Sequence, residues 1–204
     1  QLSWEELAAV PETYYTAFGS FKNMQIKEGD SILVRAATSG VGLAFLKLVK
    51  AQFPQNRVVG AVRSLAKKDL LQQQGFDEII LDERGVLQTE EKFDKILELV
   101  GPATLKNSFD HIQSAGIICN TGQLGGKWYV EEFDPIVEIK NNSFLTSFYS
   151  GNVSQQLFDE LFSYIDAYKI NVSPQRIFSL EQIPAAHSYI ESQAGFGKVV
   201  VLNN

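Results

Sequence analysis

The stretch Ser31-Ile-Leu-Val-Arg-Ala-Ala-Thr-Ser-Gly-Val-Gly42 decides the fold of this chain. An aliphatic run passes into a turn of small residues, and an apolar, helix-forming segment, 43–50, follows. A dinucleotide-binding βαβ unit has this order, because the backbone N–H groups of the turn and the positive end of the helix dipole must approach a pyrophosphate. The stretch therefore predicts a phosphate-binding turn in an α/β fold.

The turn departs from the usual glycine pattern of such sites. The spacing G-x-G-x-x-G falls on Ala37, Ser39 and Gly42, so glycine stands only at the last place, with Gly40 nearby. Turns of this composition also connect strands to helices in proteins that bind no nucleotide. On these residues alone, a nucleotide site and a purely structural turn both stay open.

A second predicted strand, residues 57–62, ends about twenty residues after the turn, where the group facing the adenosine ribose is normally found. Arg63 and Ser64 stand there, Lys67 follows, and no acid is present. A carboxylate at this place suits the ribose hydroxyls of NAD, whereas a cation and a hydroxyl suit the 2′-phosphate of NADP. These residues favour NADP(H) over NAD(H). In the alternative, Ser64 only caps a helix over 65–74 and the two cations are solvated.

Composition excludes several classes of partner. The 204 residues are 45% hydrophobic and 21% charged, enough for a buried core, and the net charge of −6 gives no general attraction to nucleic acid or anionic membrane. No segment approaches about 18 uninterrupted apolar residues, and no basic-then-apolar signal pattern opens the chain. We expect a soluble protein. The single cysteine, Cys119, lies in an apolar run, which favours a buried strand residue and a reducing, cytoplasmic setting.

Strand and helix patterns alternate along the chain. A capping box opens a first helix at Ser3, with Glu6 three residues on, and further helices follow the first two strands near Gly42 and Ser64. This order predicts a doubly wound, mainly parallel Rossmann-type sheet with helices on both faces and ligands at the carboxyl ends of the strands. Later strands are expected at 78–81, 93–100, 116–121 and 143–149, with a helix at 104–113. An appendage after Gly151 adds helices near 154–168 and 181–193 and strands at 176–180 and 198–202.

Four segments carry a family resemblance. Residues 2–18 contain A-x-x-P and T-A-aromatic elements, 36–42 an Ala/Ser/Gly loop ending in G-V-G, 75–80 a G-F-D-E-I-I element, and 195–201 a closing G-F-G-K-V-V-V strand. Together they resemble the cofactor half of the medium-chain dehydrogenase/reductase superfamily, which includes zinc-type alcohol dehydrogenases. The match is closest to its zinc-independent quinone oxidoreductase branch.

The resemblance implies that the chain is a fragment. In the family an N-terminal GroES-like domain carries the substrate pocket and, in zinc-dependent members, the zinc ligands. Residues 1–25 would then be a lead-in helix from that missing domain, 26–150 the dinucleotide-binding domain, and 151–204 an extension returning towards the missing catalytic domain. The strands at 176–180 and 198–202 would lack their usual partners here.

The resemblance also implies cofactor contacts. Asp82 stands where a Tyr often helps to hold the 2′-phosphate, and it would repel that phosphate if it pointed inward. The pair Thr38-Ser39 replaces the usual small Ala/Gly pair of the family loop, which would tighten the loop or add hydroxyl contacts. The implied contacts are the turn Thr38, Ser39, Gly40, Val41 and Gly42 for the pyrophosphate; Arg63, Ser64 and Lys67 for the 2′-phosphate; Val100 and Gly101 for the adenosine; Thr16, Thr121 and Gly122 for the nicotinamide; and Phe148 and Tyr149 for the pocket wall.

The implied activity is hydride transfer from NADPH to a quinone, an enone or a related carbonyl compound. No catalytic residue can be named, and His111 and His187 lack neighbours at metal-ligand spacing, so we interpret both as structural. Two alternatives are a zinc-dependent alcohol dehydrogenase and a non-catalytic NADP(H)-binding module. A methyltransferase is disfavoured by the missing acid after the second strand. Residues 143–149 are expected to form a homodimer contact, as is common in the family.

Overall fold

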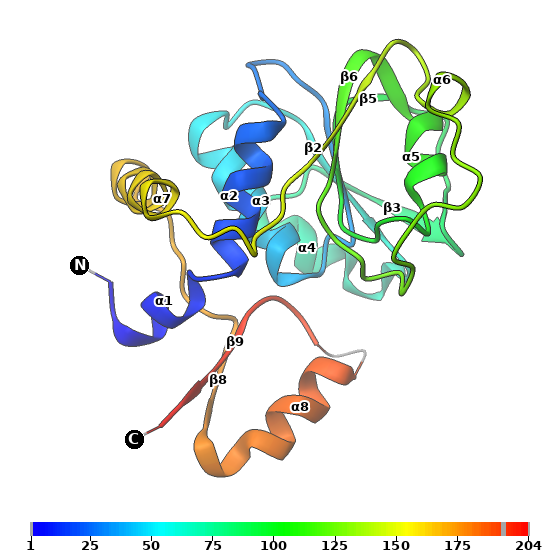
Figure 1. The fold of residues 1–204 in the computed structure, drawn as a ribbon. Helices are drawn as coiled ribbons and strands as arrows, with labels where there is room; N and C mark the ends of the chain where they lie inside the picture. Colours follow the sequence, from blue (N-terminus) through cyan, green and yellow to red (C-terminus); the bar gives the residue numbers. More distant parts are fainter. Residues whose placement is uncertain (1, 193–194, 204) are drawn as a thin grey trace.

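The computed structural model describes residues 2–192 and 195–203. In this part of the chain a seven-stranded sheet has the order β4-β3-β2-β1-β5-β6-β7 (Figure 1). All neighbouring strands are parallel except β3 and β4. The α/β, doubly wound prediction is confirmed. The strands are β1 Ile32–Arg35, β2 Val58–Val62, β3 Glu78–Glu83, β4 Val86–Leu87, β5 Phe93–Glu98, β6 Ile112–Asn120 and β7 Phe144–Ser147.

Helices cover both faces of this sheet. One face carries α2, α3 and α4, with α7 packed outside α2, and the other carries α5 (Figure 1). The chain crosses from β1 to β2 over the first face and from β5 to β6 over the second, so β1 and β5 flank the switch point. The helices are α1 Trp4–Ala9, α2 Thr13–Asn23, α3 Gly40–Gln52, α4 Lys68–Gln74, α5 Leu105–Asp110, α6 Pro135–Glu138, α7 Gln155–Tyr168 and α8 Ile183–Glu191, with 3-10 turns at Leu65–Lys67 and Leu180–Gln182.

Side chains of alternating strand positions form two cores. Ile32 and Val34 face the α2 and α3 side, whereas Leu33 packs on the α5 side with Phe93 and Phe109. A strand that is buried on both faces needs a continuous apolar run, because no position faces water. Arg35 breaks the run at the end of β1 and is nonetheless fully buried.

Serine side chains set the starts of three predicted helices. The Ser3 capping box with Glu6 is present at α1, and the Leu157 N–H donates to Ser154 Oγ at the start of α7. At α3 the Gly42 N–H donates to Ser39 Oγ at 3.1 Å. The helix therefore begins at Gly40, two residues before the start that the sequence suggested, because the cap lies at Ser39.

The helix predicted over 104–113 was wrong at its end. It stops at Asp110, and β6 begins at Ile112, not at 116. The N–H of Phe93 donates to the His111 carbonyl at 2.8 Å, so the chain has already entered the sheet there. An irregularity in the β5–β6 register absorbs the additional residues, and a periodic pattern cannot reveal such a bulge.

Three further elements differ from the expectations. The lead-in segment is two helices, separated near Pro11 where Glu12 has a positive φ of 63°. The hairpin strand β4 and the short helix α6 were not expected; α6 begins with Asp134 as its cap and Pro135 in its first turn. The last residue of the helix expected over 181–193 lies outside the described residues.

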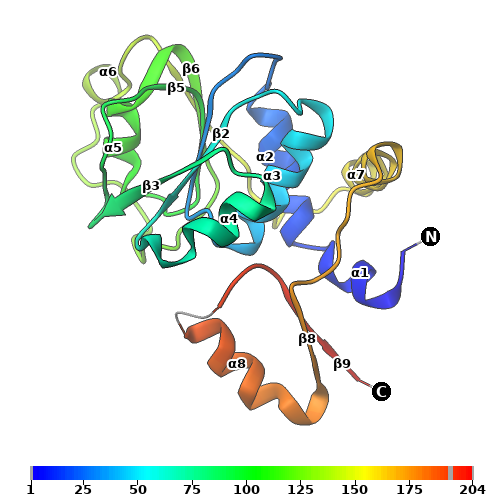
Figure 2. The ribbon, with the colours of Figure 1, turned by 180° about the vertical axis from the view of Figure 1, so that it is seen from behind.

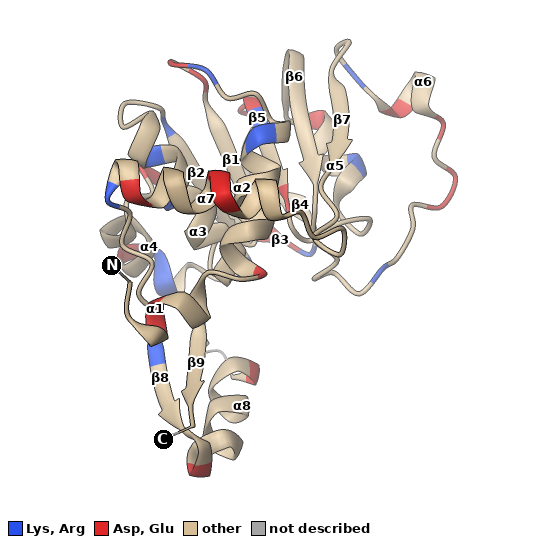
Figure 3. Ribbon diagram, turned by 60° about the vertical axis from the view of Figure 1, so that its left-hand side comes forward, with Lys and Arg blue, Asp and Glu red and all other residues tan. Residues whose placement is uncertain are grey.

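The C-terminal part stands apart from the main sheet, as Figure 2 shows. Strands β8 (Arg176–Ser179) and β9 (Val199–Leu202) pair with each other in parallel and form a two-stranded sheet, with α8 packed against them. Each of the two strands therefore has the other as its partner, and neither pairs with a further strand among the described residues. Figure 3 shows both signs of charge scattered over all parts of the molecule.

Candidate functional site

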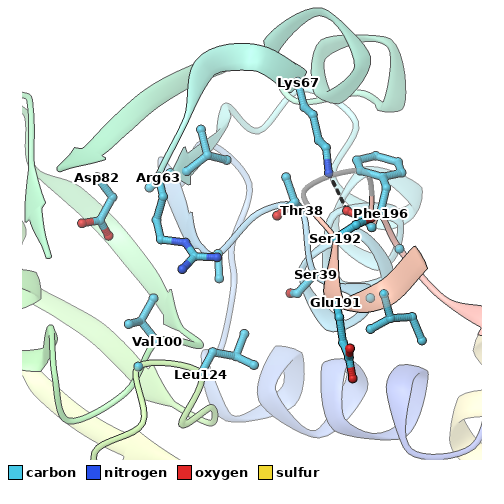
Figure 4. Close-up of a pocket in the computed structure, with 18 residues that line it drawn as sticks. Thr38, Ser39, Arg63, Lys67, Asp82, Val100, Leu124, Glu191, Ser192 and Phe196 are labelled. Carbon is cyan, nitrogen blue, oxygen red and sulfur yellow. Dashed lines mark hydrogen bonds between the residues drawn. The ribbon is translucent and has the colours of Figure 1, made fainter. Parts of the chain in front are cut away.

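A cavity of about 540 Å³ lies where the strands of the main sheet end (Figure 4). Its walls come from the segments that follow β1, β2 and β5, from Asp82 of β3, and from the loop after β6. The far side is closed by the end of α8 and by residues 195–197. The cavity therefore lies at the carboxyl end of the sheet beside the switch point, where open α/β folds bind ligands.

The turn after β1 brings the amino terminus of α3 to this cavity. Thr38, Ser39 and Gly40 line it, and Gly40 and Val41 are the first two residues of α3. Their amides have no acceptor one turn earlier in the helix, and the helix dipole adds positive potential there. Gly42 lies beneath the turn, where a Cβ atom would come within 3.0 Å of the Ala36 carbonyl oxygen. This end of the cavity suits an anion.

Two of the three predicted 2′-phosphate contacts line the cavity. Arg63 points into it (Figure 4) and has no hydrogen-bond or ion-pair partner among the residues that the structure describes. Lys67 donates to the Gly195 carbonyl at 2.5 Å, and burial lowers the pKa of its ammonium group. Ser64 does not line the cavity; its hydroxyl accepts from the Ala66 N–H and caps the 3-10 turn.

Asp82 lines the cavity, but its charge is held by Arg35. Asp82 Oδ2 accepts from Arg35 Nε at 3.0 Å and from Nη2 at 2.7 Å. The same guanidinium also donates to the Thr104 carbonyl and to Ser108 Oγ. The carboxylate that was expected to repel a phosphate is therefore neutralised by a buried partner.

Glu98 completes this buried cluster and was missed by sequence reasoning. Its Oε2 lies 3.6 Å from Arg35 Nη1, and its Oε1 accepts from the N–H groups of Val100 and Gly101 at 2.9 and 3.0 Å. Burial raises the pKa of the Glu98 carboxyl, while Arg35 and the hydrogen bonds act in the opposite direction. The carboxylate fixes the loop that carries Val100 on the cavity wall. Arg35 and Glu98 are charged residues within aliphatic strands, and this pattern in the sequence could have revealed the cluster.

The residues predicted to meet nicotinamide do not line this cavity. Thr121 Oγ1 lies 2.9 Å from Ser20 Oγ. Thr16 is buried on α2, and its Oγ1 lies 3.5 Å from Glu12 Oε1. Phe148 and Tyr149 line a separate cavity between β7, α2 and α7.

Gly101 and Gly122 serve a close approach of two loops. A Cβ atom on Gly101 would lie 2.2 Å from the Gly122 carbonyl oxygen, and one on Gly122 would lie 2.0 Å from that of Leu99. Neither glycine lines the cavity, whereas Leu124 and Gly125 of the same loop do. The latter two were missed, because only the folded loop brings them beside Val100.

The C-terminal segment forms a wall that sequence reasoning also missed. The Gly197 N–H donates to the Thr38 carbonyl at 3.2 Å, and Gly197 forms an isolated parallel bridge with Ser39. Glu191 and Phe196 lie on the same side of the cavity. These residues are more than 150 positions from the turn they cover, so local patterns could not place them there.

Among residues 2–192 and 195–203, no three or more His, Cys, Asp or Glu side chains form a group that could hold a metal ion. His111 Nδ1 lies 3.0 Å from the Glu91 carbonyl oxygen, which supports its structural interpretation. No helix in these residues has the length and apolar character to span a membrane.

Comparisons with known proteins show the family of the chain. The model of a family described as zinc-binding dehydrogenases matches residues 74–201. Probable polyketide synthase 14 of Dictyostelium discoideum is 24% identical over 98% of this chain and 7% of its own length. The 2-methylene-furan-3-one reductase of Solanum lycopersicum is 26% identical over 98% of this chain and 47% of its own length. A probable quinone oxidoreductase of Schizosaccharomyces pombe is 24% identical over 88% and 56%. The chain thus spans 56% of the length of the quinone oxidoreductase, 47% of that of the reductase and 7% of that of the polyketide synthase.

Solved structures share the fold. The quinone oxidoreductase from Coxiella burnetii matches with a TM-score of 0.78 and 22% identity, over 100% of this chain and 62% of that one. A mycobacterial protein, Rv1454c, solved with NADPH, matches with 0.80 and 22%, over 100% and 67%. The Bacillus subtilis protein yhfP, solved with NAD, matches with 0.79 and 22%, over 98% and 64%.

Proposed function

Since this chain belongs to the zinc-binding dehydrogenase family, within the medium-chain dehydrogenase/reductase superfamily of oxidoreductases, we propose that it binds NADP(H) in the cavity beside α3. The observation that carries this proposal is that Arg63 has no hydrogen-bond or ion-pair partner among the described residues and lines the same cavity as the α3 amino terminus. A guanidinium and a helix amino terminus are both suited to phosphate groups. NADPH offers two such groups, its pyrophosphate and its 2′-phosphate.

The residues of the turn would hold the pyrophosphate. The N–H groups of Gly40 and Val41 at the start of α3 would bind it, and Thr38 would add its hydroxyl. The N–H of Ser39 already donates to the Ala36 carbonyl at 3.0 Å, so this residue would act as the helix cap. Arg63 and Lys67 would hold the 2′-phosphate. The Lys67 ammonium has three donors and uses one of them on the Gly195 carbonyl. Val100 would face the adenosine, with Gly101 shaping its loop. Thr16, Thr121, Gly122, Phe148 and Tyr149 would meet the nicotinamide end only if the cofactor extends past the cavity.

The proposed reaction is reduction of a quinone, an enone or a related carbonyl compound. When bound, NADPH supplies the hydride, and this chain binds and orients it. The reductase and quinone oxidoreductase names of the relatives favour this substrate class. The relatives are longer than the matched region, so we place the substrate pocket on a further domain of the intact protein. The described residues contain no group of three or more His, Cys, Asp or Glu side chains that could hold a metal ion. The ligands of a zinc site would therefore have to come from other residues. The non-catalytic binding module is the alternative.

Two further proposals concern the setting of the protein. Strand β7 pairs only with β6 among the described strands, and its Phe144 is 58% exposed, so we propose that β7 forms a homodimer edge. Sedimentation of the intact protein as a monomer would contradict this.

We also propose a cytoplasmic location, since Cys119 is a buried, free thiol.

Calorimetric titration with NADPH and with NADH tests the cofactor proposal. We expect NADPH to bind more tightly, and Arg63→Ala to weaken NADPH about tenfold or more, because a hydrogen bond to a charged group contributes about 1.5–3 kcal/mol. The matched control is Lys68→Ala, which removes an exposed cation that does not line the cavity. Tighter binding of NADH would contradict the role of Arg63, and no binding of either would contradict the site itself.

A further inference from the structure

Apolar side chains and the Asp82 carboxylate line the cavity together with the cations Arg63 and Lys67. Ala61, Val62 and Val100 line it, and Figure 4 shows the Asp82 carboxylate on the same side as Arg63 and Val100. Asp82 is only 5% exposed, so it faces little water. A planar, largely apolar group would fit between such walls, and the carboxylate would be the polar feature that it meets.

The Asp82 carboxylate uses only one of its oxygens. Oδ2 accepts both donors of Arg35, whereas Oδ1 is buried and has no hydrogen-bond partner among the described residues. A buried carboxylate oxygen without a donor is costly, and such groups are rare in folded proteins. The structure therefore contains a vacant acceptor immediately behind the cavity wall.

We propose that Asp82 determines specificity for the base of the dinucleotide by accepting a hydrogen bond from the exocyclic amine of adenine. This inference rests on the proposed NADP(H) site. The torsion about the Cβ–Cγ bond of Asp is soft, so the carboxylate turns one oxygen towards the cavity while Arg35 keeps the other. Arg35 is fully buried and also bonded to Thr104 and Ser108, which holds it in place during this turn.

Chemistry selects the amine among the groups of NADPH. An ionised carboxylate only accepts hydrogen bonds, and it repels the phosphates. The 2′ oxygen of NADPH is esterified and offers no donor. The 3′ hydroxyl of the same ribose is a donor, but it lies beside the 2′-phosphate, which the carboxylate repels. Adenine has two apolar faces, which suit Val62 and Val100, and an amine in the plane of the ring. A base with a carbonyl oxygen in place of that amine would meet the carboxylate with an acceptor and leave both unpaired.

The test compares NADPH with its hypoxanthine analogue, in which a carbonyl oxygen replaces the exocyclic amine. We expect the 204-residue chain to bind the analogue about tenfold or more weakly in calorimetric titrations. Asp82→Asn keeps an oxygen for Arg35 and offers an N–H donor to the cavity. We expect this variant to reduce the preference for NADPH about tenfold or to invert it. The matched control is Asp159→Asn, an exposed carboxylate on α7 that should leave the ratio unchanged.

The outcomes separate the two proposals. If the wild-type chain binds neither dinucleotide, the proposed NADP(H) site fails. If it binds NADPH and the analogue equally, or if Asp82→Asn keeps the wild-type ratio, NADP(H) binding stands and the role of Asp82 is overturned. If Asp82→Asn does not fold, Asp82→Glu replaces it, because it keeps the charge that Arg35 needs but displaces the acceptor. It should then lower the ratio at least about threefold, and an unchanged ratio overturns the inference.

Discussion

Two walls of the cavity, those on the main sheet, are built by opposite kinds of interaction. One wall is the turn Thr38 to Gly40, where the amino terminus of α3 begins and a single hydroxyl, that of Ser39, caps the helix. The other wall rests on a buried ion cluster of Arg35, Asp82 and Glu98, which joins the ends of β1, β3 and β5. The first wall depends on residues adjacent in sequence, and the second on charges that only the sheet brings together. We expect the second to contribute more to stability and the first more to phosphate binding.

Removing the central cation should have the largest effect. Arg35→Met leaves Asp82 and Glu98 as two buried carboxylates without a counter-charge, and we expect a loss of about 3–5 kcal/mol in the free energy of unfolding in urea. The control is Arg57→Met, whose pairs with Glu78 and Glu91 are partly exposed and should cost less than about 1 kcal/mol. Equal losses in the two variants would mean that the buried cluster contributes no more to the free energy of unfolding than the partly exposed pairs of Arg57.

The cluster should also give stability a dependence on pH through Glu98. Burial raises the pKa of this carboxyl in the folded state, so the unfolded chain loses its proton first as the pH rises. The contribution of this carboxyl to stability is present in full below its pKa in the unfolded chain. It is lost as the pH rises through its pKa in the folded protein. Glu98→Gln removes this loss, so its unfolding free energy relative to the wild type should increase from pH 4 to pH 7. A difference that stays constant across urea titrations at these values would contradict the assignment.

Loss of the cap at the other wall should have a smaller effect. Ser39→Ala removes the hydroxyl that accepts from the Gly42 N–H, and we expect a cost of about 1 kcal/mol in unfolding free energy. NADPH affinity should fall as well, since the start of α3 frays. A variant that keeps wild-type stability would show that the turn holds its shape without the cap.

The smallest effect is expected at Ser64. Its hydroxyl caps only a three-residue 3-10 turn on the exposed surface, so Ser64→Ala should cost less than about 0.5 kcal/mol. The hydroxyl does not line the cavity, so calorimetry should find NADPH affinity within about twofold of the wild type. A larger loss of affinity would mean that Ser64 reaches the 2′-phosphate after all.

Local patterns predicted the parts of the fold whose reasons are local. Serine caps, aliphatic strands and small-residue turns depend on neighbours within a few residues. The structure confirms the capping box predicted at Ser3, and it adds serine caps at Ser39 and Ser154. The β6 start at Ile112 and the strand β4 could not be predicted in this way. A bulge and a two-residue hairpin strand depend on what the neighbouring strand offers, and periodicity does not record it.

The sequence by itself determined the α/β class, the small-residue turn after β1 and the cations after β2, because each follows from a short run of residue types. Only the tertiary structure decided how the cavity is closed and how its charges are balanced. Arg35 and Asp82 are 47 positions apart, and Thr38 and Gly197 are far more distant along the chain. Contacts of this kind arise from the packing of strands and loops, so their electrostatic consequences exist only in the folded molecule.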